Sequence, residues 1–230
     1  MKTFKDYLED AFTKHVFKTS GEKLSRNKLS LYEQLEKYKD NKNIYISFRS
    51  VDKIGINPKS IYKNPIGIYA FPLKSIWENF DHINKQIKIP NFGNNPFLYV
   101  IESVGNGIED ISVYTEEQLK NDFNKLKNSE FLNRFKSEDF DKIFKDSLTE
   151  SWVKSYGGRL WYITRILAEN FKDKKSNIVW NFIFNKILNY NFICDYSGTG
   201  ILGRHEPKQA VFFNTKCFKV IDKLYIKENL

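Results

Sequence analysis

Few of the residues and patterns that define specialised protein classes occur in this sequence. Only two of its 230 residues are cysteine, Cys194 and Cys217, which is too few for a disulfide framework. Without a CxxC pair or a Cys/His cluster they do not indicate zinc, so we expect both to be small buried core residues. No apolar run reaches the roughly 20 residues that a membrane helix requires, because Lys186 interrupts the most apolar stretch, residues 178–194.

Signals for export and for several enzyme classes are also missing. The first residues carry no apolar signal-peptide core, so we expect a cytosolic protein or one packaged from a cytosol. The sequence has no Walker loop, GxSxG elbow, HExxH motif or paired-carboxylate motif. Its three histidines, His15, His82 and His205, fall on different predicted elements and indicate no shared metal site.

The composition is that of an ordinary folded domain. Hydrophobic residues make up 41% and charged residues 28%, and the 16% of aromatic residues can fill a core. The net charge of +9 is uneven, since residues 151–230 carry 13 Lys and Arg against 6 Asp and Glu. A basic C-terminal part suits an anionic partner such as nucleic acid or a phosphate-bearing cofactor, although solubility alone also explains it.

Hydrophobic periodicity predicts an α+β fold with a mixed sheet of short strands and inserted helices. Helical spacing is found at residues 3–18, 31–38, 74–84, 115–148 (as two helices), 152–171 and 177–190. Strand patterns are found at residues 44–51, 66–73, 97–104, 192–194 and 209–213, with an Asn106-Gly107 turn after the third. We therefore expect an N-terminal helical segment over 1–43 and a domain over 44–230 with a helical insertion at about 115–190.

Alternation over the first strand assigns its residues to two faces. One face is predicted to carry Ile44, Ile46 and Phe48, and the other Tyr45, Ser47 and Arg49. Before the last predicted strand, three glycines within six residues, at 198, 200 and 203, describe a flexible loop that ends where a buried strand begins. Loops that are pinned to a rigid strand in this way often carry sites.

Three separated segments, in a fixed order, resemble one known group of proteins. They are Tyr45 to Arg49, Asn57 to Leu73 (NPKSIYKNPIGIYAFPL), and Asp195 to Phe213, which contains the glycine loop and the strand after it. Together they are similar to the ADP-ribosyltransferase-like domains of bacteriophages and their polyvalent proteins. The resemblance implies an ADP-ribosyltransferase-like fold that takes NAD as a substrate.

The resemblance also implies which residues bind NAD. In that group a His or Arg on the first strand holds the nicotinamide ribose; here Ser47 stands where the group has His, and Arg49 follows on the same face. A Tyr or Ser of the second segment packs against nicotinamide, a role that falls on Tyr69 with Tyr62 nearby. NAD is then expected between the Tyr45 to Arg49 strand, the Tyr62 to Tyr69 region and the Arg204 to Gln209 loop.

The reaction implied by the resemblance requires a group that stabilises positive charge. The C–N glycosidic bond of NAD breaks through an oxocarbenium-like state, which a carboxylate stabilises. The position that leads the last strand is Gln209, which is uncharged, so Glu206 is the nearest carboxylate. The candidate catalytic residues are therefore Arg49, Glu206 and Gln209.

The opening residues, MKTFKDYLEDA, resemble the N-terminal capsid-targeting peptide of internal head proteins in T-even-like bacteriophages. Those peptides are amphipathic helices, which a head protease removes after Leu or Ile, any residue, then Glu. Here Tyr7 takes the place of the Leu or Ile before Glu9, so an ordinary N-terminal helix is the alternative interpretation.

Three hypotheses for function follow. The first is a phage-encoded transferase that moves ADP-ribose from NAD to a host protein or nucleic acid, in the host cytoplasm or packaged in the virion beside capsid or other virion proteins. The second is a non-catalytic virion or interaction protein on the same fold, which the Ser47 and Gln209 departures favour. The third is a basic nucleic-acid-binding module, whose binding falls steeply with salt. None of the three involves a membrane.

Overall fold

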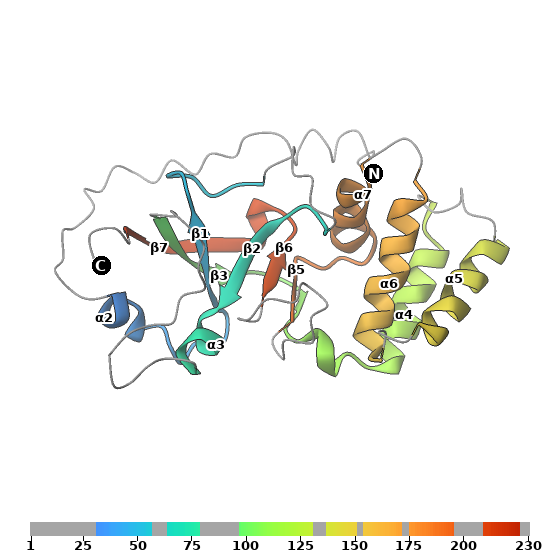
Figure 1. Cartoon of the computed structure of the whole chain (residues 1–230), viewed down its shortest axis with the longest axis horizontal. Helices are drawn as coiled ribbons and strands as arrows, with labels where there is room; N and C mark the ends of the chain where they lie inside the picture. The colour runs from blue at the N-terminus through green and yellow to red at the C-terminus, as the bar shows by residue number, and fades with distance from the viewer. Residues whose placement is uncertain are drawn as a thin grey trace.

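Strand β1 (Ile44–Arg49) lies in the interior of a seven-stranded sheet with the order β4-β5-β6-β2-β1-β3-β7 (Figure 1). The structure, a computed structural model, describes residues 31–56, 64–78, 97–130, 137–150, 154–171, 175–195 and 209–225. Within these residues β4 and β5 pair in parallel and the other neighbouring strands pair antiparallel. This mixed sheet is combined with helices, as the predicted α+β class requires.

The remaining elements are short. The strands are β2 (Ile68–Pro72), β3 (Phe97–Ser103), β4 (Gly107–Ile108), β5 (Phe192–Cys194), β6 (Ala210–Phe212) and β7 (Phe218–Tyr225). The α-helices are α2 (Leu31–Glu36), α3 (Leu73–Glu78), α4 (Glu116–Lys127), α5 (Ser137–Thr149), α6 (Tyr156–Glu169) and α7 (Ser176–Phe182). The predicted helix at 3–18 and the glycine loop lie outside the described residues.

One side of the sheet, called the helix face below, is covered by helices. Ile44 and Ile46 of β1 are buried there with Leu35 of α2 and Ile76 of α3, as the alternation of β1 predicts. On the same side, Val211 of β6 is buried in a second cluster with residues of α6 and α7. Apolar residues on alternate positions of the strands therefore hold both groups of helices against the sheet.

The opposite side, called the Arg49 face below, carries Tyr45, Ser47 and Arg49. The cluster buried on it is built from the strands, from Ile54 and from Cys217, and no α-helix among the described residues contributes to it. Cys194 belongs to the same cluster, and both cysteines are buried and unbridged, which confirms their predicted place in the core. Helices thus pack on one face of the sheet, whereas the cluster on the Arg49 face contains no residue of a described α-helix.

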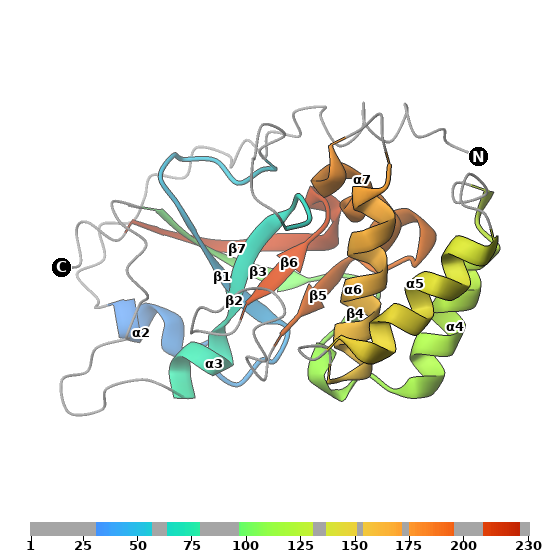
Figure 2. The same cartoon turned by 45° about the vertical axis from the view of Figure 1, so that its right-hand side comes forward.

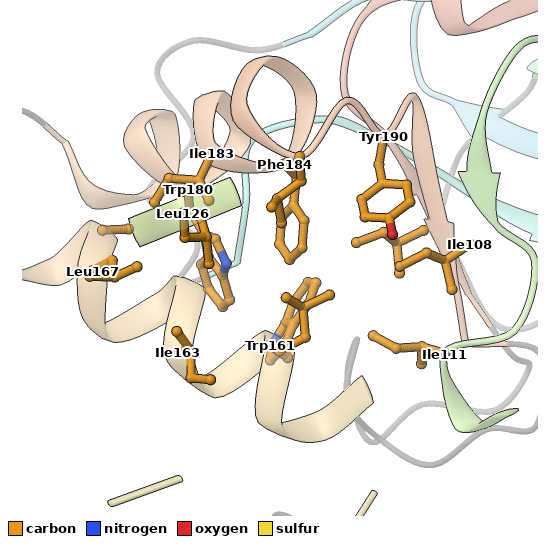
Figure 3. Packing of buried hydrophobic residues seen from close by; sticks show 14 of the residues in the cluster. Ile108, Ile111, Leu126, Trp161, Ile163, Leu167, Trp180, Ile183, Phe184 and Tyr190 are labelled. Atoms are coloured by element: carbon orange, nitrogen blue, oxygen red, sulfur yellow. The ribbon is translucent and has the colours of Figure 1, made fainter. Parts of the chain in front are cut away.

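Helices α4 to α7 follow one another between β4 and β5, where a helical insertion was predicted, and they lie together beside β5 (Figures 1 and 2). Their core is aromatic. The ring centroids of Trp161 and Trp180 lie 4.6 Å apart, and those of Trp161 and Phe184 lie 5.5 Å apart. Figure 3 shows these side chains packed together. Inside this apolar packing, the Trp180 indole donates a hydrogen bond of 2.8 Å to the Thr164 hydroxyl, so its polar atom is satisfied.

Local signals set where these helices begin. Thr115 caps α4, and its hydroxyl accepts from the Gln118 N–H at 3.2 Å while the Gln118 side chain accepts from the Thr115 N–H at 2.8 Å. These two reciprocal hydrogen bonds form a capping box. Ser155 caps α6, and in its first turn Gly157 packs so tightly that a Cβ atom would overlap the carbonyl oxygen of Ile111.

A buried carboxylate anchors α4. Asp122 is 1% exposed and accepts hydrogen bonds from the hydroxyls of Tyr114 at 2.5 Å and Tyr190 at 2.7 Å, and Lys125 Nζ lies 2.8 Å from its other oxygen. Burial is the main cause that raises the pKa of both tyrosines, which keeps them protonated as donors. A buried charge requires partners of this kind, so the cluster ties α4 to the segment that precedes β5.

The structure differs from the sequence prediction at a turn, at a helix end and at one strand. The Asn106-Gly107 turn is displaced, because Gly107 begins β4 and pairs with Phe192, and it is Gly105 that adopts the positive φ of 79°. The helix predicted over 177–190 ends at Phe182 and continues as a π-helix over Ile183–Ile187. Strand β7 was not predicted, because its sequence, FKVIDKLY, mixes apolar and charged residues without regular alternation.

Candidate functional site

The candidate site is the Arg49 face at the end of β1. Strand β1 pairs with β3 along its whole length, but its pairing with β2 is limited to Tyr45 with Pro72 and Ile46 with Phe71. The last three residues of β1 therefore pair with β3 on one side and with no residue of β2 on the other. Side chains, instead of backbone groups, can bridge the other side.

Ser47 provides such a bridge. It is fully buried, and its hydroxyl donates a hydrogen bond of 2.9 Å to the carbonyl oxygen of Tyr69 on β2. The Tyr69 side chain lies on the helix face, packed against the cluster of α6 and α7, and its hydroxyl donates to the carbonyl oxygen of Pro65 at 2.8 Å. The structure thus links Ser47 and Tyr69 through the backbone, but it places the Tyr69 ring on the side away from Arg49.

Tyr45 forms the apolar part of the site. It is 3% exposed and packs edge-on against Phe212 and Phe192, with ring centroids 5.1 Å and 5.9 Å away. Burial, with a smaller contribution from the neighbouring Cys194, raises the pKa of the Tyr45 phenol, so it stays neutral. Its ring belongs to the core of the Arg49 face, and a ligand would meet at most its edge.

Arg49 is the chemically unusual residue of this face. It is partly buried, and its Nε and Nη2 atoms are shielded from solvent and lack a hydrogen-bond partner in the part of the chain that the structure describes. Burial lowers the pKa of Arg49 to about 10, opposed by the neighbouring Tyr99 phenol. A guanidinium normally uses its donors in ion pairs or bidentate hydrogen bonds, so these atoms are available to an anion.

A polar cluster beside Arg49 was not predicted. Asp52 accepts a hydrogen bond of 2.9 Å from the Tyr99 hydroxyl and forms an ion pair with Lys223, whose ammonium also lies 5.3 Å from the centroid of the Phe97 ring. Hydrogen bonding to Lys223 is the main cause that lowers the pKa of Asp52. The alternation of residues 97–104 gave the strand, but no local signal in the sequence reports which residue of β7 lies opposite Tyr99.

Gln209, the other predicted catalytic residue that the structure describes, is not brought together with Arg49. Gln209 directly precedes β6 and uses its backbone carbonyl to accept from the Asp195 N–H at 2.8 Å. Gln209 comes just before Ala210, which pairs with Ala70 on β2, and the next residue of β2, Phe71, pairs with Ile46 on β1. Gln209 is therefore level with Ile46, whereas Arg49 lies three residues further along β1. Tyr62, Arg204 and Glu206 lie outside the described residues.

The described residues hold no group of three or more His, Cys, Asp or Glu side chains placed to bind a metal ion. The three histidines lie outside those residues. Within the same ranges, every helix is too short or too polar to span a lipid bilayer.

Comparisons with known proteins add no relatives. No protein-family model matches the chain, and neither a curated protein nor a solved structure matches it. The resemblance of the three sequence segments therefore stays a prediction. Function has to be inferred from the residues of the site.

Proposed function

We propose that this chain is an ADP-ribosyltransferase-like protein, encoded by a bacteriophage, that binds NAD on the Arg49 face. The observation that carries the proposal is the pair of Arg49 nitrogens at the end of β1, Nε and Nη2, which are shielded from solvent and have no hydrogen-bond partner among the described residues. A buried cation without a counter-ion is costly, and an anion that joins it recovers part of that cost. NAD supplies such an anion, because the planar guanidinium fork matches the oxygens of its diphosphate and ribose.

The reaction that follows is the transfer of ADP-ribose to an acceptor on a host protein or nucleic acid. The bond between ribose C1′ and the nicotinamide nitrogen breaks, and nicotinamide leaves with the electron pair. A lone pair of the acceptor forms the new bond to C1′, and the acceptor releases its proton to water. Arg49 holds the ligand, and Glu206 is the carboxylate proposed to stabilise the positive charge on the ribose ring.

A second candidate is a protein that binds the same ligand without reaction. Two contacts favour it: the Ser47 hydroxyl donates its proton to a backbone carbonyl instead of to the nicotinamide ribose, and the Tyr69 hydroxyl donates to the Pro65 carbonyl with its ring on the opposite side of the sheet from Arg49. Gln209 has no charge with which to stabilise a cation. Catalysis then depends on Glu206 alone, which makes that residue the one that separates the two candidates.

The test combines NAD titration by calorimetry with chromatographic assay of released nicotinamide. Arg49→Ala is expected to weaken NAD binding about 10- to 100-fold, since it removes charge-assisted hydrogen bonds. The matched control is Arg165→Ala, because Arg165 is an exposed arginine of α6 that pairs with Glu169 at 2.7 Å. The control is expected to bind NAD within twofold of the unmodified protein.

Glu206→Gln then separates transferase from binding protein. Loss of nicotinamide release with NAD binding retained supports the transferase, and binding without release in the unmodified protein supports the second candidate. The proposal is rejected if the protein does not bind NAD at a concentration of about 5 mM, which is the limit of weak affinity. It is also rejected if Arg49→Ala binds NAD as tightly as the unmodified protein does.

A further inference from the structure

Asp52 fastens the segment that follows β1 to the sheet. Its Oδ1 atom accepts hydrogen bonds from the Tyr99 hydroxyl at 2.9 Å and from Lys223 Nζ. Tyr99 is on β3, and Lys223 lies opposite it on β7. One carboxylate of the connecting segment is therefore bound to two strands of the sheet.

The strand register places these contacts on the Arg49 face. Ser47 lies opposite Tyr99, and Tyr99 lies opposite Lys223, so their side chains share the side that carries Arg49. The chain turns sharply at the end of β1 and leaves the direction of the strand (Figure 2). Asp52 is bonded on this side, and Ile54, which is 3% exposed, belongs to the cluster buried there. Residues 50–56, called the strap below, therefore fold back over the Arg49 face.

The strap lies on the same face of the sheet as the Arg49 guanidinium. The Nε and Nη2 atoms of Arg49 are shielded from solvent, so a ligand reaches them only after some part of the protein moves. Residues 50–53 are exposed, with Val51 at 60%, and the Asp52 side chain is itself 53% exposed. Ion pairs and hydrogen bonds at such exposure are weak, so the exposed half of the strap can detach without unfolding the sheet.

We propose that Asp52 is a latch: its bonds to Tyr99 and Lys223 hold the strap closed over Arg49, and an anionic ligand enters when these bonds break. The proposal rests on the proposed function only in taking Arg49 as the ligand-binding residue. A variant that weakens the latch is expected to bind ligand faster, whereas loss of a purely structural contact would slow ligand binding or leave it unchanged.

The experiment measures two quantities on the full chain. The first is hydrogen–deuterium exchange of the backbone amides of residues 50–56 without ligand. The second is the association rate constant, by stopped flow, of two probes, NAD and inorganic pyrophosphate. Asp52→Asn removes the charge of the latch, whereas Tyr99→Phe removes one latch bond and leaves the charge in place. The control is Glu169→Gln, which removes an exposed, paired carboxylate on α6.

Both latch variants are expected to exchange faster over 50–56 and to associate about three- to tenfold faster, which corresponds to the loss of about one ordinary hydrogen bond. The control is expected to change neither quantity. Slower association in either variant, or faster association in Asp52→Asn alone without faster exchange, overturns the latch. If pyrophosphate binds through Arg49 and NAD does not, the NAD proposal fails while the latch is still decided by the pyrophosphate rates.

Discussion

Replacing Arg49 by methionine is expected to stabilise the ligand-free protein. Most substitutions of partly buried residues destabilise, so the direction is informative. The lowering of the pKa of Arg49 to about 10 from an ordinary value of roughly 12.5 corresponds to about 3 kcal/mol against the charged form, at about 1.4 kcal/mol for each factor of ten. Methionine has a similar length and no charge. After allowing for partial solvent screening and lost packing, we expect a gain of about 1–2 kcal/mol.

Urea denaturation measures this gain as a higher midpoint at an unchanged slope. The pH dependence gives a second check. The folded protein binds the Arg49 proton less tightly than the unfolded chain does, so the penalty is fully present below about pH 10 and disappears as the pH rises further. The advantage of Arg49→Met is therefore expected to be constant near neutral pH and to shrink above pH 10.

Arg165→Met is the matched control, because Arg165 is exposed and paired with Glu169, and it is expected to change the free energy of unfolding by less than about 0.5 kcal/mol. The reasoning is refuted if Arg49→Met is less stable than the unmodified protein without ligand. Saturating ligand is expected to offset or reverse this order, because the ligand binds more tightly to the protein that keeps Arg49 and stabilises it more.

Two further predictions concern the scaffold, and both are read by urea denaturation. Gly157→Ala is expected to lower the free energy of unfolding by about 2–4 kcal/mol, because the added Cβ would overlap the Ile111 carbonyl oxygen. The control is Gly55→Ala, which has open space around it and is expected to change the free energy of unfolding by less than about 1 kcal/mol. Equal effects of the two substitutions would contradict the close packing of α6. Asp122→Asn is expected to cost about 2–4 kcal/mol, because the buried tyrosine hydroxyls lose a charged acceptor, and the exposed Asp141→Asn less than about 0.5 kcal/mol. A loss at Asp122 no larger than at Asp141 would contradict the anchoring of α4.

Features that depend on neighbouring residues in the chain were predictable. The alternation of residues 44–49 gave both strand β1 and its two faces, because a half-buried strand repeats every two residues. The capping box of α4 was predictable for the same reason, since both of its hydrogen bonds join residues three apart. The buried face of α6, with Leu160 and Leu167, also follows from helical periodicity.

Features that depend on distant residues were not predictable. Strand β7 is held by its pairing with β3, which lies more than a hundred residues earlier, and its own pattern is irregular because the register shifts between Val100 and Ile101. Asn181 illustrates the same limit. It reads as a polar interruption of an apolar helix, yet its amide donates to the carbonyl oxygens of Ile66 and Phe213, which fixes α7 to the strands β2 and β6.

The candidate site was predictable in part. Alternation placed Tyr45, Ser47 and Arg49 on one face, but it did not show that the Ser47 hydroxyl donates a hydrogen bond to the Tyr69 backbone carbonyl. The face of Tyr69 was likewise not predictable, because Ile66 to Leu73 is apolar on both sides and carries no alternating signal. The Asp52 contacts depend on the register of two strands, which the sequence does not encode locally.

The two faces of β1 explain how the protein tolerates the shielded Arg49 cation at the end of this strand. Ile44 and Ile46 are 1% and 0% exposed on the helix face, and β1 pairs with β3 through Arg49 itself. The backbone at Arg49 is therefore held by apolar packing and by a strand ladder that do not involve the guanidinium. A charge that the backbone of this strand does not require, and that burial disfavours, is accounted for by a ligand. The sign of the Arg49→Met effect with and without that ligand is thus the most direct measure of whether the Arg49 face is a binding site.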